Sequence, residues 1–337
     1  MAFLPFLHKV TEAKPLSEQE AEAAMNLILE GHAAPVPLAA FLAAYRVVGL
    51  SGPDMTGFAR GLRSHLTPVN VNLKPGEVLL DTCGTGGDGT GTFNISTVTA
   101  FVVAGAGVKV GKHGNRSVSS VCGSADILEA LGVPIHTDPT LMAADIERAG
   151  FAFLFAAVLH PGMKHVGPIR AELKMRTLFN LLGPLANPAS ASVQLIGAPS
   201  VNDASHIAEA LYALGSRSAL VVHGSDGLDE LTTTGSSTVF RIADTIHEEV
   251  WQPEDFGLPR ASLADLLGGD RDHNAAIATA ILTNQDQGPK RDIVLLNAAA
   301  ALMIARGLSP RDAVAAARAS LDSGAALGVL RRLQNRG

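Results

Sequence analysis

From Glu77 onward, short apolar runs rich in β-branched residues alternate with segments of helical periodicity, and these runs include EVLLDTC, VKVGKHG, FAFLFA, VQLIGA and SALVVHG. Continuous hydrophobicity within a run is typical of a strand that is buried on both faces, and strands that alternate with helices form parallel sheets. The pattern therefore predicts an α/β unit with a mostly parallel sheet. Near the end, STVFRIAD and IHEEVWQ predict an antiparallel edge, because only a short turn separates them.

The first seventy or so residues predict helices only. Ser17 and Glu20 form a plausible capping box for a helix through Ile28, a second helix is expected from about 36 to 48, and a third from about 53 to 65. One insertion, PIRAELKMRTLFNLLGPLANP at 168–188, interrupts the strand and helix alternation with two short helical pieces. We therefore predict a small all-helical domain from 1–76 plus about 168–189, and a larger α/β domain from 77–167 plus 190–337.

Composition limits the class of protein. Of the 337 residues, 47% are hydrophobic and 17% are charged, which is typical of a folded globular chain. The net charge of −6 argues against a nucleic-acid partner, which would require an excess of Lys and Arg. Cys83 and Cys122 are too few for a disulfide framework and suit a reducing compartment, so we expect a cytoplasmic protein. No leader pattern and no membrane span are expected.

A glycine-rich segment, DTCGTGGDGTGTFNIST at 81–97, places five glycines in eight positions between a predicted strand and a predicted helix. In a parallel sheet, the loop after a strand faces the crevice where ligands bind, and glycine lets several N–H groups approach one anion. Asn94, Ser96 and Thr97 would add side-chain donors at the first turn of the helix. The segment predicts a phosphate site. It matches neither the dinucleotide-binding pattern nor a Walker A motif, and the alternative is a mobile glycine-rich surface loop.

Two further clusters follow predicted strands. GKHGNRSVSS at 111–120 combines Lys112, His113, Asn115 and Arg116 with serines, which predicts binding of an anion that carries several charges. GSDGLDELT at 224–232 places Asp229 beside Glu230, and such a carboxylate pair can hold Mg²⁺ together with substrate phosphates. Taken alone, each cluster would be interpreted as a solvated loop or turn.

Together, GTGGD, FNIST, KHGNRSVSS, the 168–188 insertion and GLDE resemble the anthranilate phosphoribosyltransferase family in order and spacing, over nearly the entire chain. The resemblance implies a fold of the nucleoside phosphorylase/phosphoribosyltransferase-like, class IV type, with the active site at the hinge between the two domains. It also implies a homodimer and allows association with anthranilate synthase. The implied reaction joins anthranilate to 5-phosphoribosyl 1-diphosphate, releasing diphosphate, in tryptophan biosynthesis.

The resemblance also implies the site residues. Lys112, Asp229 and Glu230 would be catalytic, and Ser96, Asp229 and Glu230 would hold Mg²⁺, as two ions bridged by Glu230. Anthranilate would lie at Gly84, Asn115 and Arg170. The positions implied to bind the phosphoribosyl diphosphate are Gly84, Gly87, Asp88, Thr92, Asn94, Ile95, Ser96, Thr97, Lys112, His113, Gly114, Asn115, Arg116, Ser117, Val118, Ser119, Ser120 and Ser124.

Some alternatives stay open from the sequence. His113 and His160 are candidates for residues that face the substrate amine, but a histidine before Pro161 could equally serve the local structure. Cys122 is expected to be a small buried residue rather than a nucleophile. A pyrimidine nucleoside phosphorylase would share the fold and a glycine-rich phosphate loop, although it should lack the paired Asp and Glu. A non-catalytic relative that binds nucleic acid would require a basic face.

Overall fold

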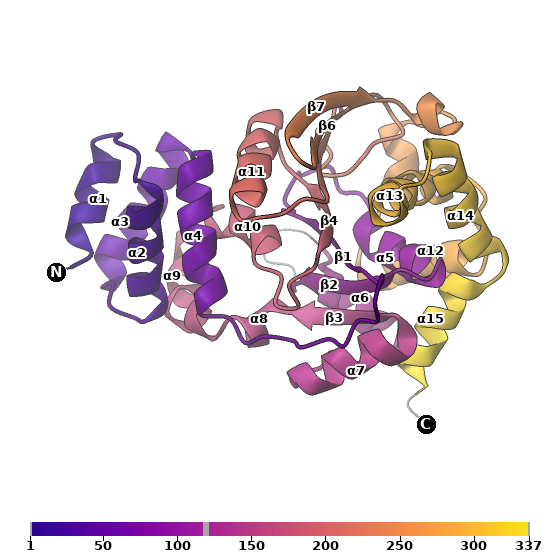
Figure 1. The fold of residues 1–337 in the computed structure, drawn as a ribbon, viewed down its shortest axis with the longest axis horizontal. Coiled ribbons are helices and arrows are strands. Elements are labelled where there is room, and N and C mark those ends of the chain that lie inside the picture. Colours follow the sequence, from indigo (N-terminus) through magenta and orange to yellow (C-terminus); the bar gives the residue numbers. More distant parts are fainter. Residues whose placement is uncertain (1, 117–120, 336–337) are drawn as a thin grey trace.

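The computed structural model describes residues 2–116 and 121–335, and its centre is a seven-stranded sheet of order β3-β2-β1-β4-β5-β6-β7 (Figure 1). The first five strands in the chain run parallel to one another, whereas β6 and β7 add antiparallel pairs at one edge. This arrangement confirms the predicted mostly parallel sheet and its antiparallel edge. The strands are β1 (Leu79–Gly84), β2 (Lys109–Gly114), β3 (Phe151–Phe155), β4 (Val193–Gly197), β5 (Ala219–Gly224), β6 (Ser237–Ile242) and β7 (Ile246–Trp251).

Strand order reverses at β1. The chain runs from β1 to β2 and β3 on one side, and then returns to place β4 on the other side of β1. Gly84 and Gly197 are register partners at the ends of β1 and β4. In open α/β sheets, ligands bind outside the carboxyl ends of the strands at such a reversal. The topology therefore places the glycine-rich loop, which follows β1, at the expected position of a ligand crevice.

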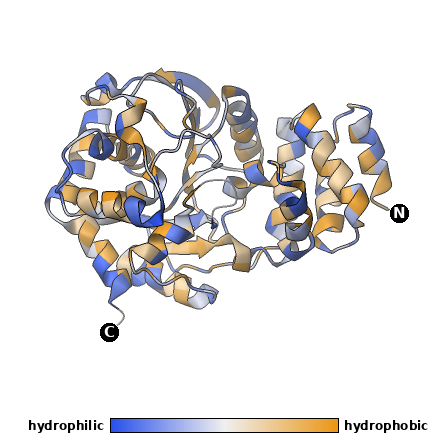
Figure 2. Cartoon of the chain, turned by 180° about the vertical axis from the view of Figure 1, so that it is seen from behind, coloured by the Kyte–Doolittle hydropathy of each residue, from blue (hydrophilic) through white to orange (hydrophobic). Residues whose placement is uncertain are grey.

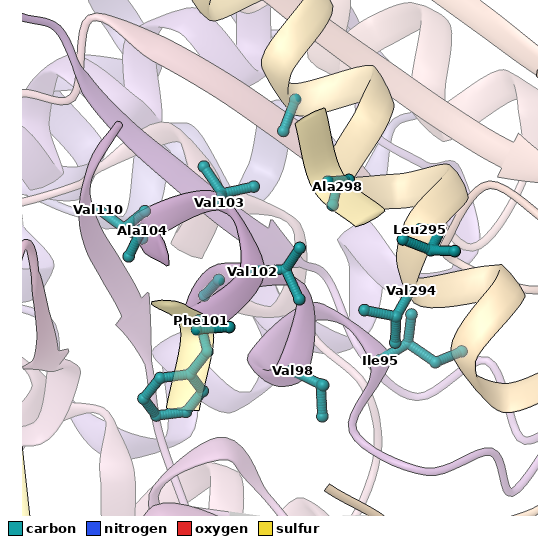
Figure 3. Close-up of a cluster of buried hydrophobic side chains, with 14 of the residues drawn as sticks. Ile95, Val98, Phe101, Val102, Val103, Ala104, Val110, Val294, Leu295 and Ala298 are labelled. Carbon is teal, nitrogen blue, oxygen red and sulfur yellow. The ribbon is translucent and has the colours of Figure 1, made fainter. Parts of the chain in front are cut away.

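One face of the sheet is covered by α5 (Ile95–Gly105) and α13 (Pro289–Arg306), whose buried side chains interdigitate in Figure 3. Nine of the eleven residues of α5 are buried, among them Val98, Phe101 and Val102. A helix that is apolar on all sides is stable only inside a core. Because α5 is held so firmly, the residues at its beginning have a fixed position beside the end of β1.

The other face of the sheet packs against α7 (Pro139–Ala149) and α11 (Val201–Ala213). The remaining elements of the larger part are α6 (Ser124–Ala130), α8 (Ala156–Leu159), η1 (Pro161–His165), η3 (Pro253–Phe256), η4 (Leu263–Leu266), α12 (Arg271–Leu282), α14 (Pro310–Asp322) and α15 (Ala325–Gln334). Helix α15 was not expected from the sequence, although its buried face joins the same core as α5.

The N-terminal segment forms four helices, α1 (Leu4–Thr11), α2 (Glu18–Leu29), α3 (Pro35–Val48) and α4 (Gly52–Ser64). The capping box of Ser17 and Glu20 is present, so the predicted start of α2 is confirmed. Helix α1 is not among the helices predicted from the sequence. Proline in the first turn of a helix costs no hydrogen bond, and Pro5 is compatible with the start of α1.

The insertion forms α9 (Gly167–Leu173), α10 (Phe179–Leu182) and η2 (Gly183–Leu185). Phe179 and Leu182 belong to one buried cluster with Phe41 and Phe58 of the N-terminal helices, and this cluster continues to Ile196 of β4. Figure 1 shows α9 beside α1–α4, and Figure 2 shows from behind that hydrophobic residues line both these helices and the central strands. The packing supports the grouping of the insertion with the first helices, and the domain boundaries stay a prediction.

Within the described ranges, no single helix combines the length and the apolar character that a membrane span needs. Helices α13 and α14 meet those criteria only when taken together, and they are bent by 114° at their junction.

Candidate active site

The glycine-rich loop and the turn after β5 meet at Asp229. The backbone N–H of Gly86 donates to Asp229 Oδ2 at 2.7 Å. A Cβ at Gly197 would lie 1.5 Å from the carbonyl oxygen of Asp229, and a Cβ at Gly84 would lie 2.6 Å from its Oδ2. Only glycine fits where the ends of β1 and β4 approach this turn so closely. The sequence pattern did not single out Gly197, because its neighbour is 32 residues further along the chain.

Lys112, at the centre of β2, joins the second cluster to the first. Its side chain is 2% exposed, and its Nζ donates to the carbonyl oxygen of Thr82 and, at 3.1 Å, to Ser96 Oγ. Thr82 Oγ1 in turn donates to the backbone carbonyl of Ser96 at 3.1 Å. A buried ammonium needs acceptors or negative charge nearby. Lys112 is therefore a fixed positive charge between the end of β1 and the first turn of α5.

Three carboxylates concentrate negative charge here. Burial is the main cause that raises the pKa of Asp229, and repulsion from Asp88 adds to it. Burial also raises the pKa of Glu230, with further repulsion from Asp229, while the charge of Lys112 acts in the opposite direction. The carboxyls of Asp229 and Glu230 are therefore harder to ionise than ordinary ones unless a cation is bound beside them.

The donor set fits a hard divalent cation. Asp229, Glu230 and the Ser96 hydroxyl supply oxygen ligands, which Mg²⁺ prefers, and the raised pKa values indicate that a cation would relieve charge repulsion. Across residues 2–116 and 121–335, no group of three or more His, Cys, Asp and Glu side chains could hold a metal ion. Any bound Mg²⁺ would therefore need further ligands from water or substrate phosphates.

His113 and His160 form a neutral buried pair. His113 Nδ1 lies 3.1 Å from the carbonyl oxygen of Gly183, so this nitrogen carries the proton and His113 Nε2 accepts from His160 Nε2 at 3.1 Å. Burial lowers the pKa of His113 to about 3 and that of His160 to about 4. The pair links β2 to the insertion. Both histidines therefore make structural contacts, which the sequence left open as the alternative to facing the substrate amine.

Other predicted residues of the phosphate envelope have contacts of their own. The Asn94 side chain, expected as a donor to phosphate, donates to the carbonyl oxygen of Cys122 at 3.1 Å and makes no capping bond to α5. The Thr97 hydroxyl is buried without a hydrogen-bond partner in the described part of the chain, so it is not presented to solvent as a donor. In both cases tertiary packing, which local spacing does not reveal, decides the side-chain position.

Asp88 accepts from the backbone and the hydroxyl of Thr90, which shapes the glycine-rich loop. Arg116 is partly exposed and pairs with Glu129 and Asp126 of α6. Ser124 Oγ donates to the carbonyl oxygen of Asn115 at 3.2 Å. Ser117, Val118, Ser119 and Ser120 lie outside the described residues. Cys122 is buried and its pKa is raised, mainly by burial, which agrees with the expectation that it is not a nucleophile.

The insertion contributes two arginines. Arg170 of α9 donates to Asn180 Oδ1 at 3.2 Å and lies over the ring of Phe179. Among the described residues, the structure shows no hydrogen bond from Arg170 to Gly84 or Asn115. Arg176, which the sequence reasoning missed, donates to the carbonyl oxygen of Gly87 at 2.5 Å. The sequence did offer one signal for Arg176, because it is a basic residue of the insertion, beside the predicted hinge between the domains.

A cavity of about 330 Å³ lies between the helical segments and the glycine-rich loop. Its lining combines Tyr45 and Leu50 of the N-terminal segment with Gly87 and Arg176. Asn187 provides a second link across this region, because its Nδ2 donates to Asp81 Oδ2 at 2.7 Å and to the Gly111 carbonyl oxygen at 2.9 Å. The site therefore lies beside the junction of the helical part and the sheet.

Known proteins share these features. Residues 4–66 match the model of the glycosyl transferase family, helical bundle domain, and residues 76–327 match that of the glycosyl transferase family, a/b domain. Anthranilate phosphoribosyltransferase of Solibacter usitatus (strain Ellin6076) is 51% identical over 328 residues, which cover 97% of this chain and 96% of the relative.

Two solved structures are similar over almost the whole chain. Anthranilate phosphoribosyltransferase from Thermus thermophilus has 43% identity and a TM-score of 0.90, with 98% of each chain covered. The enzyme from Saccharomyces cerevisiae in complex with PRPP and Mg has 29% identity and a TM-score of 0.90, covering 98% of this chain and 96% of that one. The fold, the convergent loops and these matches agree, and the chain belongs to the anthranilate phosphoribosyltransferase family.

Proposed function

We propose that this chain transfers the phosphoribosyl group of 5-phosphoribosyl 1-diphosphate to the amine of anthranilate, in tryptophan biosynthesis. The observation that carries this proposal is the convergence of three segments at the end of β1. Asp229 is bound by the Gly86 N–H, and Lys112 is bound to Ser96 and Thr82. The complex of the yeast relative with PRPP and Mg supports the same substrate and ion here.

In this reaction, the bond between the sugar C1 and the diphosphate oxygen breaks while the anthranilate nitrogen forms a bond to C1. The diphosphate leaves with the bonding electron pair, and the amine loses one proton. Positive charge develops at the sugar as in glycoside cleavage. The aniline nitrogen is neutral at pH 7 and holds a lone pair, so alignment and leaving-group stabilisation matter more than a protein base.

Different residues of this chain would bind the diphosphate, the anthranilate and the Mg²⁺. The backbone N–H groups of the glycine-rich loop and the side chain of Lys112 would stabilise the diphosphate, and Arg170 would orient the carboxylate of anthranilate through two hydrogen bonds. Ser96, Asp229 and Glu230 would hold Mg²⁺, and Glu230 would bridge two ions. When bound, Mg²⁺ neutralises charge on the phosphate oxygens. Closure of the junction would exclude water from the donor.

The decisive experiment uses the fluorescence of anthranilate. Emission should fall when 5-phosphoribosyl 1-diphosphate and Mg²⁺ are added to purified protein and anthranilate, and diphosphate should appear in equal amount. Omission of Mg²⁺ or the donor should leave the emission unchanged. Phosphorolysis of thymidine without any loss of anthranilate would instead identify a pyrimidine nucleoside phosphorylase.

We further propose a homodimer, because α3 presents an exposed apolar face. Val36 is 80% exposed and Val47 is 87% exposed, and their spacing of eleven residues, about three turns, places them on one side of the helix. Scattered exposed valines are common, but a row on a single helix suits contact with a second copy. Association with anthranilate synthase and a cytoplasmic location remain predictions from the sequence.

A further inference from the structure

Two side-chain amides form a chain that joins three separate segments beside the proposed phosphate site. Asn274, in the first turn of α12, accepts from the backbone N–H of Gly269 at 2.8 Å and donates through Nδ2 to Asn94 Oδ1 at 3.1 Å. Asn94 Nδ2 then donates to the carbonyl oxygen of Cys122 at 3.1 Å. Asn274 is 3% exposed. The amides connect the start of α5, the segment before α6 and the start of α12.

The direction of every bond in this chain is determined. A backbone N–H can only donate, so the atom of Asn274 that faces Gly269 must be the oxygen. The other end of the Asn274 amide is therefore the NH₂ group, and Asn94 must turn its own oxygen toward it. The NH₂ group of Asn94 is then directed to the carbonyl of Cys122. The backbone N–H of Gly269 and the carbonyl oxygen of Cys122 thus fix the two amides from opposite ends.

This orientation affects the beginning of α5. The side chain of Asn at the N-cap position usually accepts from an N–H of the first turn, but the Asn94 side chain makes no such bond, and its oxygen accepts from Asn274. The N–H of Ser96 instead faces the carboxylate of Glu230. The N–H of Thr97 donates to the carbonyl oxygen of Asn94, whereas Ser96 lies beside Glu230 at the proposed ligand site.

The backbone on both sides strengthens the connection. Gly268 N–H donates to the Gly91 carbonyl oxygen at 2.9 Å, and Thr92 forms an antiparallel bridge with Leu267. A Cβ at Gly268 would lie 2.6 Å from Asn274 Oδ1 and 2.7 Å from the backbone of Phe93. Residues 266–274 thus lie directly against the end of the glycine-rich loop, and Asn274 extends that contact to the segment beyond residue 120.

We propose that Asn274 is a positioning residue for the phosphoribosyl diphosphate site, acting through Asn94 on the start of α5 and on the segment before α6. The proposal rests on the proposed function. Asn274 itself need not touch the substrate. Its effect is to keep the two proposed phosphate-binding segments at a fixed separation, so its loss should weaken binding of the phosphorylated substrate and leave anthranilate binding unchanged.

Two substitutions separate positioning from charge. Asn274→Asp keeps the shape and the acceptor for Gly269 but removes the donor to Asn94. The Asn94 oxygen then faces either a carboxylate oxygen of the new side chain or, if the amide reverses, the Cys122 carbonyl, and either way one hydrogen bond is lost. Asn274→Ala removes the same donor without adding charge. Because one net hydrogen bond corresponds to about a tenfold change in an equilibrium constant, we expect KM for 5-phosphoribosyl 1-diphosphate to rise about tenfold in both variants, with KM for anthranilate unchanged.

Ala278→Gly is the matched control, because Ala278 is a fully buried residue of α12 outside the amide chain, and glycine weakens the helix there. This variant should melt at a lower temperature while both KM values stay as in the wild type. The proposal is overturned if only Asn274→Asp raises the donor KM, if neither variant does, if both KM values rise together, or if Ala278→Gly has the same effect. Inactive wild-type protein would instead refute the proposed function itself.

Discussion

At the scale of single residues, Arg170 offers a selective test of substrate orientation. Replacement by alanine removes a guanidinium that can pair with the anthranilate carboxylate, and hydrogen bonds to charged groups contribute about 1.5–3 kcal/mol. We expect Arg170→Ala to raise KM for anthranilate by about tenfold to a hundredfold, with KM for the phosphorylated donor unchanged. Arg170→Lys keeps the charge but cannot form two parallel hydrogen bonds, so its KM for anthranilate in steady-state kinetics should lie between those of the wild type and Arg170→Ala. Equal kinetics in all three proteins would refute the assignment.

The carboxylate pair should control turnover rather than anthranilate binding. Glu230→Gln removes one proposed Mg²⁺ ligand while it preserves shape, so kcat should fall by about tenfold or more and the thermal stabilisation by Mg²⁺ plus donor should shrink. Asp229→Asn should behave alike. Glu249→Gln, on the partly exposed edge strand β7, is the control and should match the wild type in both measurements. A Glu230→Gln variant with full turnover would contradict the proposed metal site.

The residues that the sequence could not identify are those whose partners are distant in the chain. Gly84 and Lys112 lie in recognisable local patterns, and the structure places both in the site. Arg176, in contrast, contacts Gly87 across 89 positions, and Asn274 contacts Asn94 across 180. Neither Arg176, in the loop between α9 and α10, nor Asn274, in α12, carries a local sign of such a contact.

At the scale of elements, the histidine pair joins β2 to the insertion and should make stability sensitive to acid. The pKa of His113 is lowered to about 3 and that of His160 to about 4, so these two side chains bind more protons in the unfolded chain than in the folded one below about pH 6.5. Between pH 7 and pH 5, each histidine should therefore cost the folded state about 2 kcal/mol.

Asp81 acts in the opposite direction. Burial raises its pKa to about 6. Protonation of Asp81 between pH 7 and pH 5 therefore stabilises the folded state by about 1 kcal/mol. Burial raises the pKa values of Asp229 and Glu230 as well, so these carboxyls act in the same direction as Asp81, and the histidine contribution is measured as a difference between a variant and the wild type. In urea unfolding, the change in stability from pH 7 to pH 5 should be more favourable by about 2 kcal/mol in His160→Gln than in the wild type, because one histidine no longer takes up a proton on unfolding, and an identical change in both proteins would show that His160 does not contribute.

Local sequence patterns were sufficient to predict most helices and strands. The capping box at Ser17 set the start of α2, and the apolar runs located the strands of the sheet. Strand order could not be derived, because neighbouring strands such as β1 and β4 are separated by more than a hundred residues. Pairing over that distance depends on the complete core, whereas a cap depends on four consecutive residues.

At the scale of the whole molecule, the apolar face of α3 leads to a prediction about assembly. Val36 and Val47 are exposed in the single chain, and a charge at the centre of an apolar interface would be buried without a partner. Val47→Glu should therefore convert a dimer into a monomer in light scattering after size-exclusion chromatography, whereas Val250→Glu, at another exposed valine on β7, should not. The site residues named above all come from one chain, so the monomer should keep measurable activity. A monomeric wild-type protein, or a dimer that survives Val36→Glu combined with Val47→Glu, would place the interface elsewhere or exclude it.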